Sequence, residues 1–168
     1  MKSQMVMKKQ TTRLDEETFN RIVRSTPLIS IDLITVGEDG QVMLGLRKNR
    51  PSKGLWFVPG GRIMKNETIR EAFQRISASE LGFAIPFRKE GFLGVYEHLY
   101  PDENFAGEEG YGTHYIVLAF TVHVKKTFMR PPMEQHNSFR WFHVADLLKD
   151  AAVHPYTKDY FNGTDPVR

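Results

Sequence analysis

A doubled glycine followed by a helix-like run is the part of the sequence best suited to chemistry. Gly60 and Gly61 allow the backbone to turn tightly and to approach a ligand closely. Residues 68–83 behind them have the spacing of a helix whose first turn points at the glycine turn. A turn and a helix start in this order favour the binding of phosphate and a metal ion.

The carboxylate of Glu80 is the reactive group that this helix would carry. At about 100° per residue, Ile69, Ala72, Phe73 and Ile76 form one apolar stripe, and Glu80 falls on the same stripe. A buried carboxylate is costly unless it has a cation, a hydrogen-bonding partner or a raised pKa. The alternative is a glutamate at the helix end whose long side chain turns back to water. Spacing alone leaves both interpretations open.

Composition limits the kind of protein this is. With 168 residues, 40% of them hydrophobic, the chain fits one domain with one core. The formal net charge is +3 and the basic residues are scattered, which fits an anionic small molecule better than nucleic acid. The absence of cysteine excludes disulfides, thiolate catalysis and cysteine-bound metals. We expect a flexible leader at residues 1–13, a single domain at 14–168, no membrane span and a cytoplasmic location.

The elements that must position these groups follow from the hydrophobic pattern. Residues 28–36 and 41–47 predict a strand hairpin joined by a glycine-containing turn. A strand-rich chain with one long central helix predicts an α+β architecture in which helices cover a mixed sheet. Further strands are expected at 87–100, 113–124 and 138–142, and helices at 14–23, 144–148 and 158–161.

Three more features have two interpretations each. Asp32 interrupts the first strand, either as an edge or solvent-facing residue or as an acceptor for an arginine or a ligand hydroxyl. The basic loop 47–54 is a solvated turn or, given its place just before the glycine turn, a phosphate-binding loop. The acidic, glycine-rich loop 101–112 is a functional lid or a surface excursion.

The central segment resembles the Nudix box. Gly61, Glu67 after five intervening residues, Arg75 after seven more, and then Glu80 with Gly82 follow the spacing of that motif. Ile76 and Ser79 stand where the box usually has glutamates, so two carboxylates of the usual metal-binding set are missing.

Within this superfamily the chain resembles the GDP-mannose mannosyl hydrolase group. Similar segments occur in the same order along residues 15–161, namely Arg24-Ser25-Thr26-Pro27-Leu28, Asn49-Arg50-Pro51, Gly54, Trp56 to Arg62, Ala78 to Gly82, Thr113-His114-Tyr115 and Glu134-Gln135-His136. The resemblance implies a Nudix-like α/β/α layered fold. It also implies Mg²⁺-dependent hydrolysis of GDP-mannose to GDP and free sugar, by attack of water on the anomeric carbon with inversion. GDP-glucose is a further candidate substrate.

The resemblance also assigns roles to individual residues. One Mg²⁺ per active site would be held by the backbone carbonyl of Gly60, by Glu80 and by Gln135, and His136 would be the general base. Arg47 and Arg62 would stabilise the departing diphosphate. Asp32 and Tyr115 are the remaining expected contacts with substrate and leaving group. His98 and Trp56 are expected to line the nucleotide-sugar pocket, although an aromatic residue beside a glycine turn is more often part of the core. Glu67 and Arg75 are expected to support the site without acting in catalysis.

The expected partners are a nucleotide sugar and a second copy of the chain, because the group usually forms homodimers and serves polysaccharide synthesis. No nucleic acid or membrane partner is expected. Two other functions stay open: an ordinary Nudix pyrophosphatase acting on a nucleotide sugar, and an inactive binding module. The residues at positions 76 and 79 argue against the first, and Glu80, Gln135 and His136 together argue against the second.

Overall fold

Strand β1 (Leu28–Gly37) lies at the centre of the sheet, and its residues Ile31, Leu33 and Ile34 are buried on its two faces. The computed structural model describes residues 14–131 and 136–163, and of His136 and Asn137 it describes only the backbone. The expected leader 1–13 and the expected metal ligand Gln135 lie outside the described residues.

Seven strands form one mixed sheet. β1 pairs in parallel with β6 over ten residue pairs, and the other pairings are antiparallel. The main strand order is β3-β2-β1-β6-β5, while β4 pairs with β1 and β7 with β2. The other strands are β2 (Val42–Arg47), β3 (Trp56–Phe57), β4 (Gly60–Arg62), β5 (Phe92–Tyr100), β6 (Thr113–Val124) and β7 (His136–Phe142).

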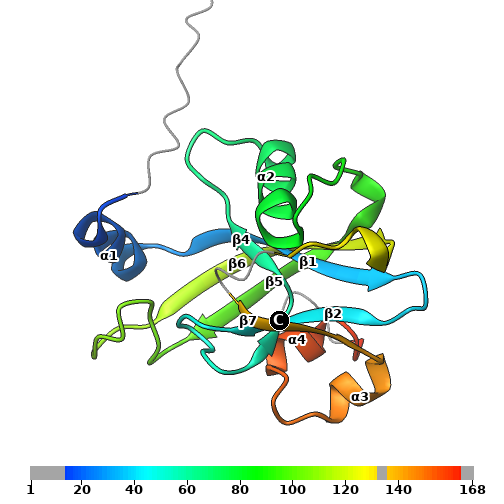
Figure 1. The fold of residues 1–168 in the computed structure, drawn as a ribbon. Coiled ribbons are helices and arrows are strands. Elements are labelled where there is room, and N and C mark those ends of the chain that lie inside the picture. The colour runs from blue at the N-terminus through cyan, green and yellow to red at the C-terminus, as the bar shows by residue number, and fades with distance from the viewer. Residues whose placement is uncertain (1–13, 132–135, 164–168) are drawn as a thin grey trace, which may run out of the picture.

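Helices cover both faces of this sheet, as Figure 1 shows, with α2 on one face and α3 and α4 on the other. The alternation of side chains along β1 creates two cores, since Ile31 and Leu33 pack toward α2 and Ile34 packs toward α3 and α4. The helices are α1 (Glu16–Ser25), α2 (Ile69–Leu81), α3 (Val144–Lys149) and α4 (Pro155–Asp159), with short 3-10 turns η1 (Lys89–Gly91) and η2 (Lys126–Phe128). The predicted α+β, α/β/α fold is therefore confirmed.

Helix α2 begins and ends on local sequence signals. Thr68 and Glu71 form a reciprocal capping box at its start, and Gly82 ends it in a left-handed conformation with φ of 88°. The predicted apolar stripe is confirmed for Ala72, Phe73 and Ile76, but Ile69 is 45% exposed. Ile69 is the first residue of the helix.

Several predicted boundaries were wrong. The strand expected at 87–100 begins only at Phe92, because a 3-10 turn precedes it, and the strand expected at 138–142 begins at His136. The last helix spans Pro155–Asp159 and not 158–161, since proline suits a first helical turn. Strands β3 and β4 were not predicted, because each is too short for a periodic pattern. None of the described helices is both long and apolar enough to cross a membrane.

Candidate active site

The glycine turn forms strand β4, which lies directly against β1. Asp32 is paired with Gly60, and a Cβ atom on Gly60 would lie 2.5 Å from Asp32 Oδ1, so that a glycine is required there. Leu33 N donates to Pro59 O at 2.8 Å, which makes the next pair, Asp32 with Gly60, a non-hydrogen-bonded pair. The carbonyl group of Gly60 therefore points away from β1, as a metal ligand must.

The buried face of α2 brings Glu80 to the same junction of β4 with α2. Gly61 faces Ile76, since a Cβ atom on Gly61 would lie 3.3 Å from Ile76 Cγ1, and Glu80 follows Ile76 by about one helical turn. Glu80 is only 4% exposed. This confirms its predicted place on the buried stripe and excludes the alternative in which its side chain turns back to water.

Oxygen donors suited to Mg²⁺ are present at this junction, although carboxylates are few. Within the described ranges 14–131 and 136–163, no group of three or more histidine and acidic side chains gathers as a metal site. Mg²⁺ commonly takes one or two protein carboxylates together with carbonyl oxygens, substrate phosphates and waters. The carboxylate of Glu80 and the carbonyl of Gly60 fit such an ion.

Glu67 and Arg75 brace the loop that joins β4 to α2. Arg75 donates from two nitrogens to Glu67 at 2.7 and 2.8 Å, and it also donates to the carbonyl oxygen of Arg62 at 2.8 Å. Glu67 in turn accepts the backbone N–H of Met64 at 3.0 Å. These contacts agree with the expected supporting role, although the cap of α2 itself is made by Thr68 and Glu71.

The two arginines expected at the diphosphate are half-buried and are held by aromatic rings. Arg47, at the end of β2, donates from Nε to Pro51 O at 2.9 Å and lies 5.5 Å from the ring centre of Phe57. The guanidinium of Arg62 lies 3.9 Å above the ring of Phe19 from α1. Burial raises the pKa of the Tyr115 hydroxyl, and the positive charges of Arg47 and Arg62 both oppose that rise. The structure therefore brings Arg47, Arg62 and Tyr115 into one electrostatic neighbourhood.

Asp32 is buried, so the interpretation as an edge or solvent-facing residue was wrong. Its Oδ2 atom accepts a hydrogen bond from the hydroxyl of Tyr160 at 2.7 Å. Burial raises the pKa of Asp32 to about 7, although the bond from Tyr160 and the charge of Arg47 oppose that rise. Asp32 is thus an acceptor for a hydroxyl group, and the hydroxyl it meets in this structure belongs to the protein.

His98 lies on β5, beside the same tyrosine. Its Nε2 atom is 3.3 Å from the hydroxyl of Tyr160, and its ring stacks on Tyr156 with 4.2 Å between ring centres and 3° between planes. Burial, with the nearby charges of His154 and Arg47, lowers the pKa of His98 to about 3. His98 is therefore neutral at physiological pH.

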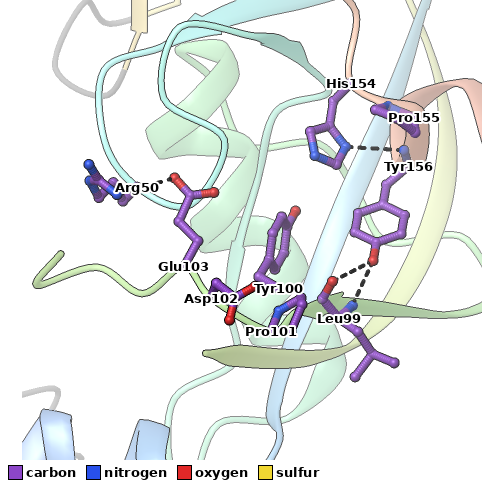
Figure 2. A pocket seen from close by; sticks show the side chains of 9 residues that line it. All are labelled: Arg50, Leu99, Tyr100, Pro101, Asp102, Glu103, His154, Pro155 and Tyr156. Carbon is purple, nitrogen blue, oxygen red and sulfur yellow. Dashed lines mark hydrogen bonds and ion pairs between the residues drawn. The ribbon is translucent and has the colours of Figure 1, made fainter. Parts of the chain in front are cut away.

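An open depression of about 510 Å³ lies next to this group. Figure 2 shows Tyr100, His154 and Tyr156 on one side of it and Arg50 with Glu103 on another. Burial and the charge of Arg47 lower the pKa of His154 to about 4. The depression is completed by Leu99, Pro101, Asp102 and Pro155.

The two other residues expected in the site, His136 and Trp56, differ in where the structure places them. The backbone of His136 opens β7 and is paired with Arg47 of β2, next to a bulge, so position 136 lies beside the expected diphosphate site. Trp56 packs edge-on against Phe142 at 5.4 Å and lies against the core. Of the two interpretations of Trp56, the structure therefore supports the core role.

The loop 101–112 is closed by its own hydrogen bonds. Asn104 is fully buried and donates to the carbonyl oxygens of Glu108 and Tyr111 at 2.7 and 2.9 Å. Glu108 is bonded to Arg24 of α1 at 2.7 Å. The loop is thus tied to α1, an arrangement that neither sequence interpretation of this loop described.

Sequence reasoning missed the aromatic group at the end of the chain. Tyr156 and Tyr160 both contact His98, and Tyr100 packs against Tyr156 at 5.4 Å. The available signal was the spacing of four residues between Tyr156 and Tyr160 in a helical segment, which places both rings on one side.

The fold and this site have the features of one hydrolase family. The family model of the NUDIX domain matches residues 26–161, and the chain belongs to the Nudix hydrolase family.

Individual relatives are similar to different extents. The low-salt glycan biosynthesis protein Agl8 of Haloferax volcanii is 34% identical over 157 residues, 94% of each chain. The ADP-ribose pyrophosphatase of Methanocaldococcus jannaschii is 35% identical over 98 residues, which are 58% of this chain and 52% of that protein. Among solved structures, the MutT protein of Methanosarcina mazei Go1 has a TM-score of 0.65 at 20% identity, over 82% of this chain and 92% of that one.

Proposed function

We propose that the protein hydrolyses GDP-mannose to GDP and free mannose, by Mg²⁺-dependent attack of water on the anomeric carbon with inversion. The observation that carries this proposal is that Glu80 is the one carboxylate on the buried face of helix α2. GDP-glucose is a further candidate substrate.

Positions 76 and 79 support a site with few carboxylates. Ile76 is 1% exposed and packs against Gly61, so that this position belongs to the core. Ser79 faces solvent and donates its hydroxyl to the carbonyl oxygen of Ile76 at 3.1 Å. Helix α2 therefore offers one carboxylate where a Nudix box usually offers more, which suits stabilisation of a leaving group better than a site with several metal ions.

The reaction needs a stabilised leaving group and an activated water. Arg47 and Arg62 suit the first task, since a guanidinium is permanently charged and donates to two phosphate oxygens at once. When bound, Mg²⁺ supplies further positive charge to the diphosphate. Asp32, Tyr115 and His98 are proposed to contact the substrate.

The proposed general base is His136. The oxygen of water forms a bond to C1 of the sugar, and the bond from C1 to the phosphate oxygen breaks with its electron pair going to GDP. The proton from water passes to His136, which suits this role because an ordinary histidine is largely neutral at pH 7 or above.

A relative that matches almost the whole chain fits a nucleotide-sugar substrate. Agl8 is named for glycan biosynthesis, and its similarity covers 94% of both chains. Sugar transfer in glycan synthesis draws on nucleotide sugars, so an enzyme acting on GDP-mannose belongs to the same area of metabolism.

A second candidate is cleavage of the diphosphate itself. The relative from Methanocaldococcus jannaschii is named an ADP-ribose pyrophosphatase, and its similarity to this chain favours an ordinary Nudix pyrophosphatase. That reaction would turn GDP-mannose into GMP and mannose 1-phosphate.

One experiment separates the candidates. GDP-mannose is incubated with the protein and Mg²⁺, and the products are identified by ³¹P and ¹H NMR, with EDTA as the control. GDP with newly formed β-mannose is the expected result. GMP with mannose 1-phosphate would establish the pyrophosphatase, and no turnover would favour a binding module.

The variant His136→Gln tests the proposed base. We expect kcat to fall by about 10²-fold or more because water loses its proton acceptor, with an unchanged circular dichroism spectrum. Turnover at the wild-type rate would remove His136 from this role.

A further inference from the structure

The hydroxyl group of Tyr160 connects two buried side chains from strands that do not pair with each other. It is 2.7 Å from Asp32 Oδ2 on β1 and 3.3 Å from His98 Nε2 on β5, and β6 lies between these two strands. Asp32, His98 and Tyr160 are 6%, 4% and 8% exposed. Water therefore competes little for these hydrogen bonds.

A phenol has one proton, and this determines the direction of both bonds. Above about pH 7 Asp32 is a carboxylate, which can only accept, so Tyr160 donates its proton to Asp32. The oxygen of Tyr160 then faces His98 as an acceptor, so His98 must donate from Nε2. Because a neutral imidazole carries one N–H, Nδ1 of His98 is left with a lone pair. No residue that the structure describes hydrogen-bonds Nδ1.

The neighbouring rings hold this arrangement in place. Tyr156 stacks flat on His98, and its own hydroxyl accepts from Leu99 N at 2.9 Å and donates to Leu99 O at 2.7 Å. The ring of Tyr160 packs edge-on against Tyr96 at 4.7 Å. The rings of His98 and Tyr160 are therefore fixed by packing, and the proton on Tyr160 is left to determine the tautomer.

We propose that Tyr160 is a positioning residue that holds His98 in the Nε2–H tautomer and so makes Nδ1 an acceptor for a hydroxyl group of the bound nucleotide sugar. The tautomer follows from the contacts of the protein alone. The part that concerns the sugar hydroxyl rests on the proposed function.

The tautomer can be read directly from the ¹⁵N chemical shifts of the imidazole nitrogens. Long-range ¹H–¹⁵N spectra of the labelled protein are recorded at pH 9, where Asp32 is a carboxylate, and His98 is assigned by its absence in His98→Asn. We expect Nε2 to be protonated and Nδ1 to be unprotonated in the wild type. In Tyr160→Phe we expect a mixture of tautomers. A wild-type His98 protonated on Nδ1, or an unchanged tautomer in Tyr160→Phe, would overturn the proposal.

Tyr96→Phe is the matched control. It removes a hydroxyl from the ring that packs on Tyr160, and that hydroxyl contacts neither Asp32 nor His98 in the structure. The tautomer of His98 should stay as in the wild type. A change of tautomer in Tyr96→Phe as large as that in Tyr160→Phe would assign the effect to packing and overturn the role of the Tyr160 hydroxyl.

Kinetics test the part that concerns substrate. With GDP-mannose we expect Tyr160→Phe to raise KM in proportion to the loss of the Nε2–H tautomer, about twofold for an equal mixture, and to change kcat less. Unchanged KM would overturn the role in substrate binding. If the wild type does not hydrolyse GDP-mannose at all, the proposed function fails, while the NMR spectra still decide the tautomer.

Discussion

At the scale of single residues, the chemistry of Asp32 is determined by what surrounds it. The residue lies on a central strand, beside the glycine turn, with one hydroxyl bonded to it and Arg47 nearby. The high pKa that burial gives this carboxyl group means that its ionisation opposes folding. A residue kept in such a place is a candidate for function, since it costs stability.

Asp32→Asn should be more stable than the wild type at alkaline pH. In the folded protein the pKa of Asp32 is about 7, against an ordinary 3.8, so the wild type loses stability as pH rises between these values. The loss is about 1.4 kcal/mol per pH unit, or about 4 kcal/mol in all, and asparagine does not ionise. Urea unfolding at pH 4, 6 and 8 should show a growing advantage of the variant. A difference in unfolding free energy between variant and wild type that does not change with pH would contradict the raised pKa of Asp32.

Glu80→Gln should weaken the binding of Mg²⁺. An amide oxygen carries no charge, so we expect the Mg²⁺ concentration for half-maximal activity to rise by about tenfold or more. Titration of activity with MgCl₂ measures this, and Mn²⁺ electron paramagnetic resonance measures binding without substrate. Glu90→Gln changes an exposed glutamate in the same way and is the control. Equal Mg²⁺ requirements in both variants would exclude Glu80 as a ligand.

At the scale of elements, the unit of β4, its following loop and α2 holds the site together. Side-chain contacts of Glu67 and Arg75 fix the loop between them, and Gly61 lets α2 approach β4 closely. On the other face, α4 covers the outer edge of β5, because Tyr156 bonds both backbone groups of Leu99. Both helices thus position site residues that lie on strands.

Glu67→Gln should loosen the β4–α2 unit. The side chain of Glu67 is 5% exposed and accepts two charged hydrogen bonds from Arg75, and an amide cannot accept both with its single oxygen. We expect the free energy of unfolding to fall by about 2 kcal/mol, because Arg75 is partly solvated and regains some hydration. Urea denaturation measures this, with Glu109→Gln at an exposed glutamate as the control. Equal losses of unfolding free energy in both variants would show that the contacts between Glu67 and Arg75 do not stabilise the loop.

At the scale of the whole molecule, the sheet carries its two cores on opposite faces, and the proposed site lies where β1, β2, β4 and α2 meet. The outer strand β5 leaves Phe92, Leu93 and Leu99 between 42% and 53% exposed. Apolar side chains exposed along an outer strand offer surface for contact with another protein.

We expect the protein to be a homodimer in solution. Burial of apolar surface on β5 would stabilise the pair, in line with the resemblance to a group that usually forms dimers. Light scattering coupled to size exclusion should give about twice the chain mass of 19.4 kDa. A mass of one chain at micromolar concentration would contradict the expectation.

The sequence by itself determined the features that depend on local pattern. The period of α2 put Glu80 on the buried stripe, and the apolar run at Thr113–Val124 formed β6 within the predicted bounds. Such signals come from residues within a few turns of each other, so a linear pattern contains them.

Only the tertiary structure decided which residues surround these groups. It buried Asp32, placed Tyr160 at its carboxylate across 128 residues of chain, and brought the backbone of His136 beside Arg47. It also exposed Ile69 and turned Trp56 toward the core. Contacts between distant segments depend on how sheets and helices pack, and no local spacing records them. The sequence therefore determined that a buried glutamate, Glu80, follows the Gly60-Gly61 turn along the chain. The tertiary structure decided which groups surround that glutamate.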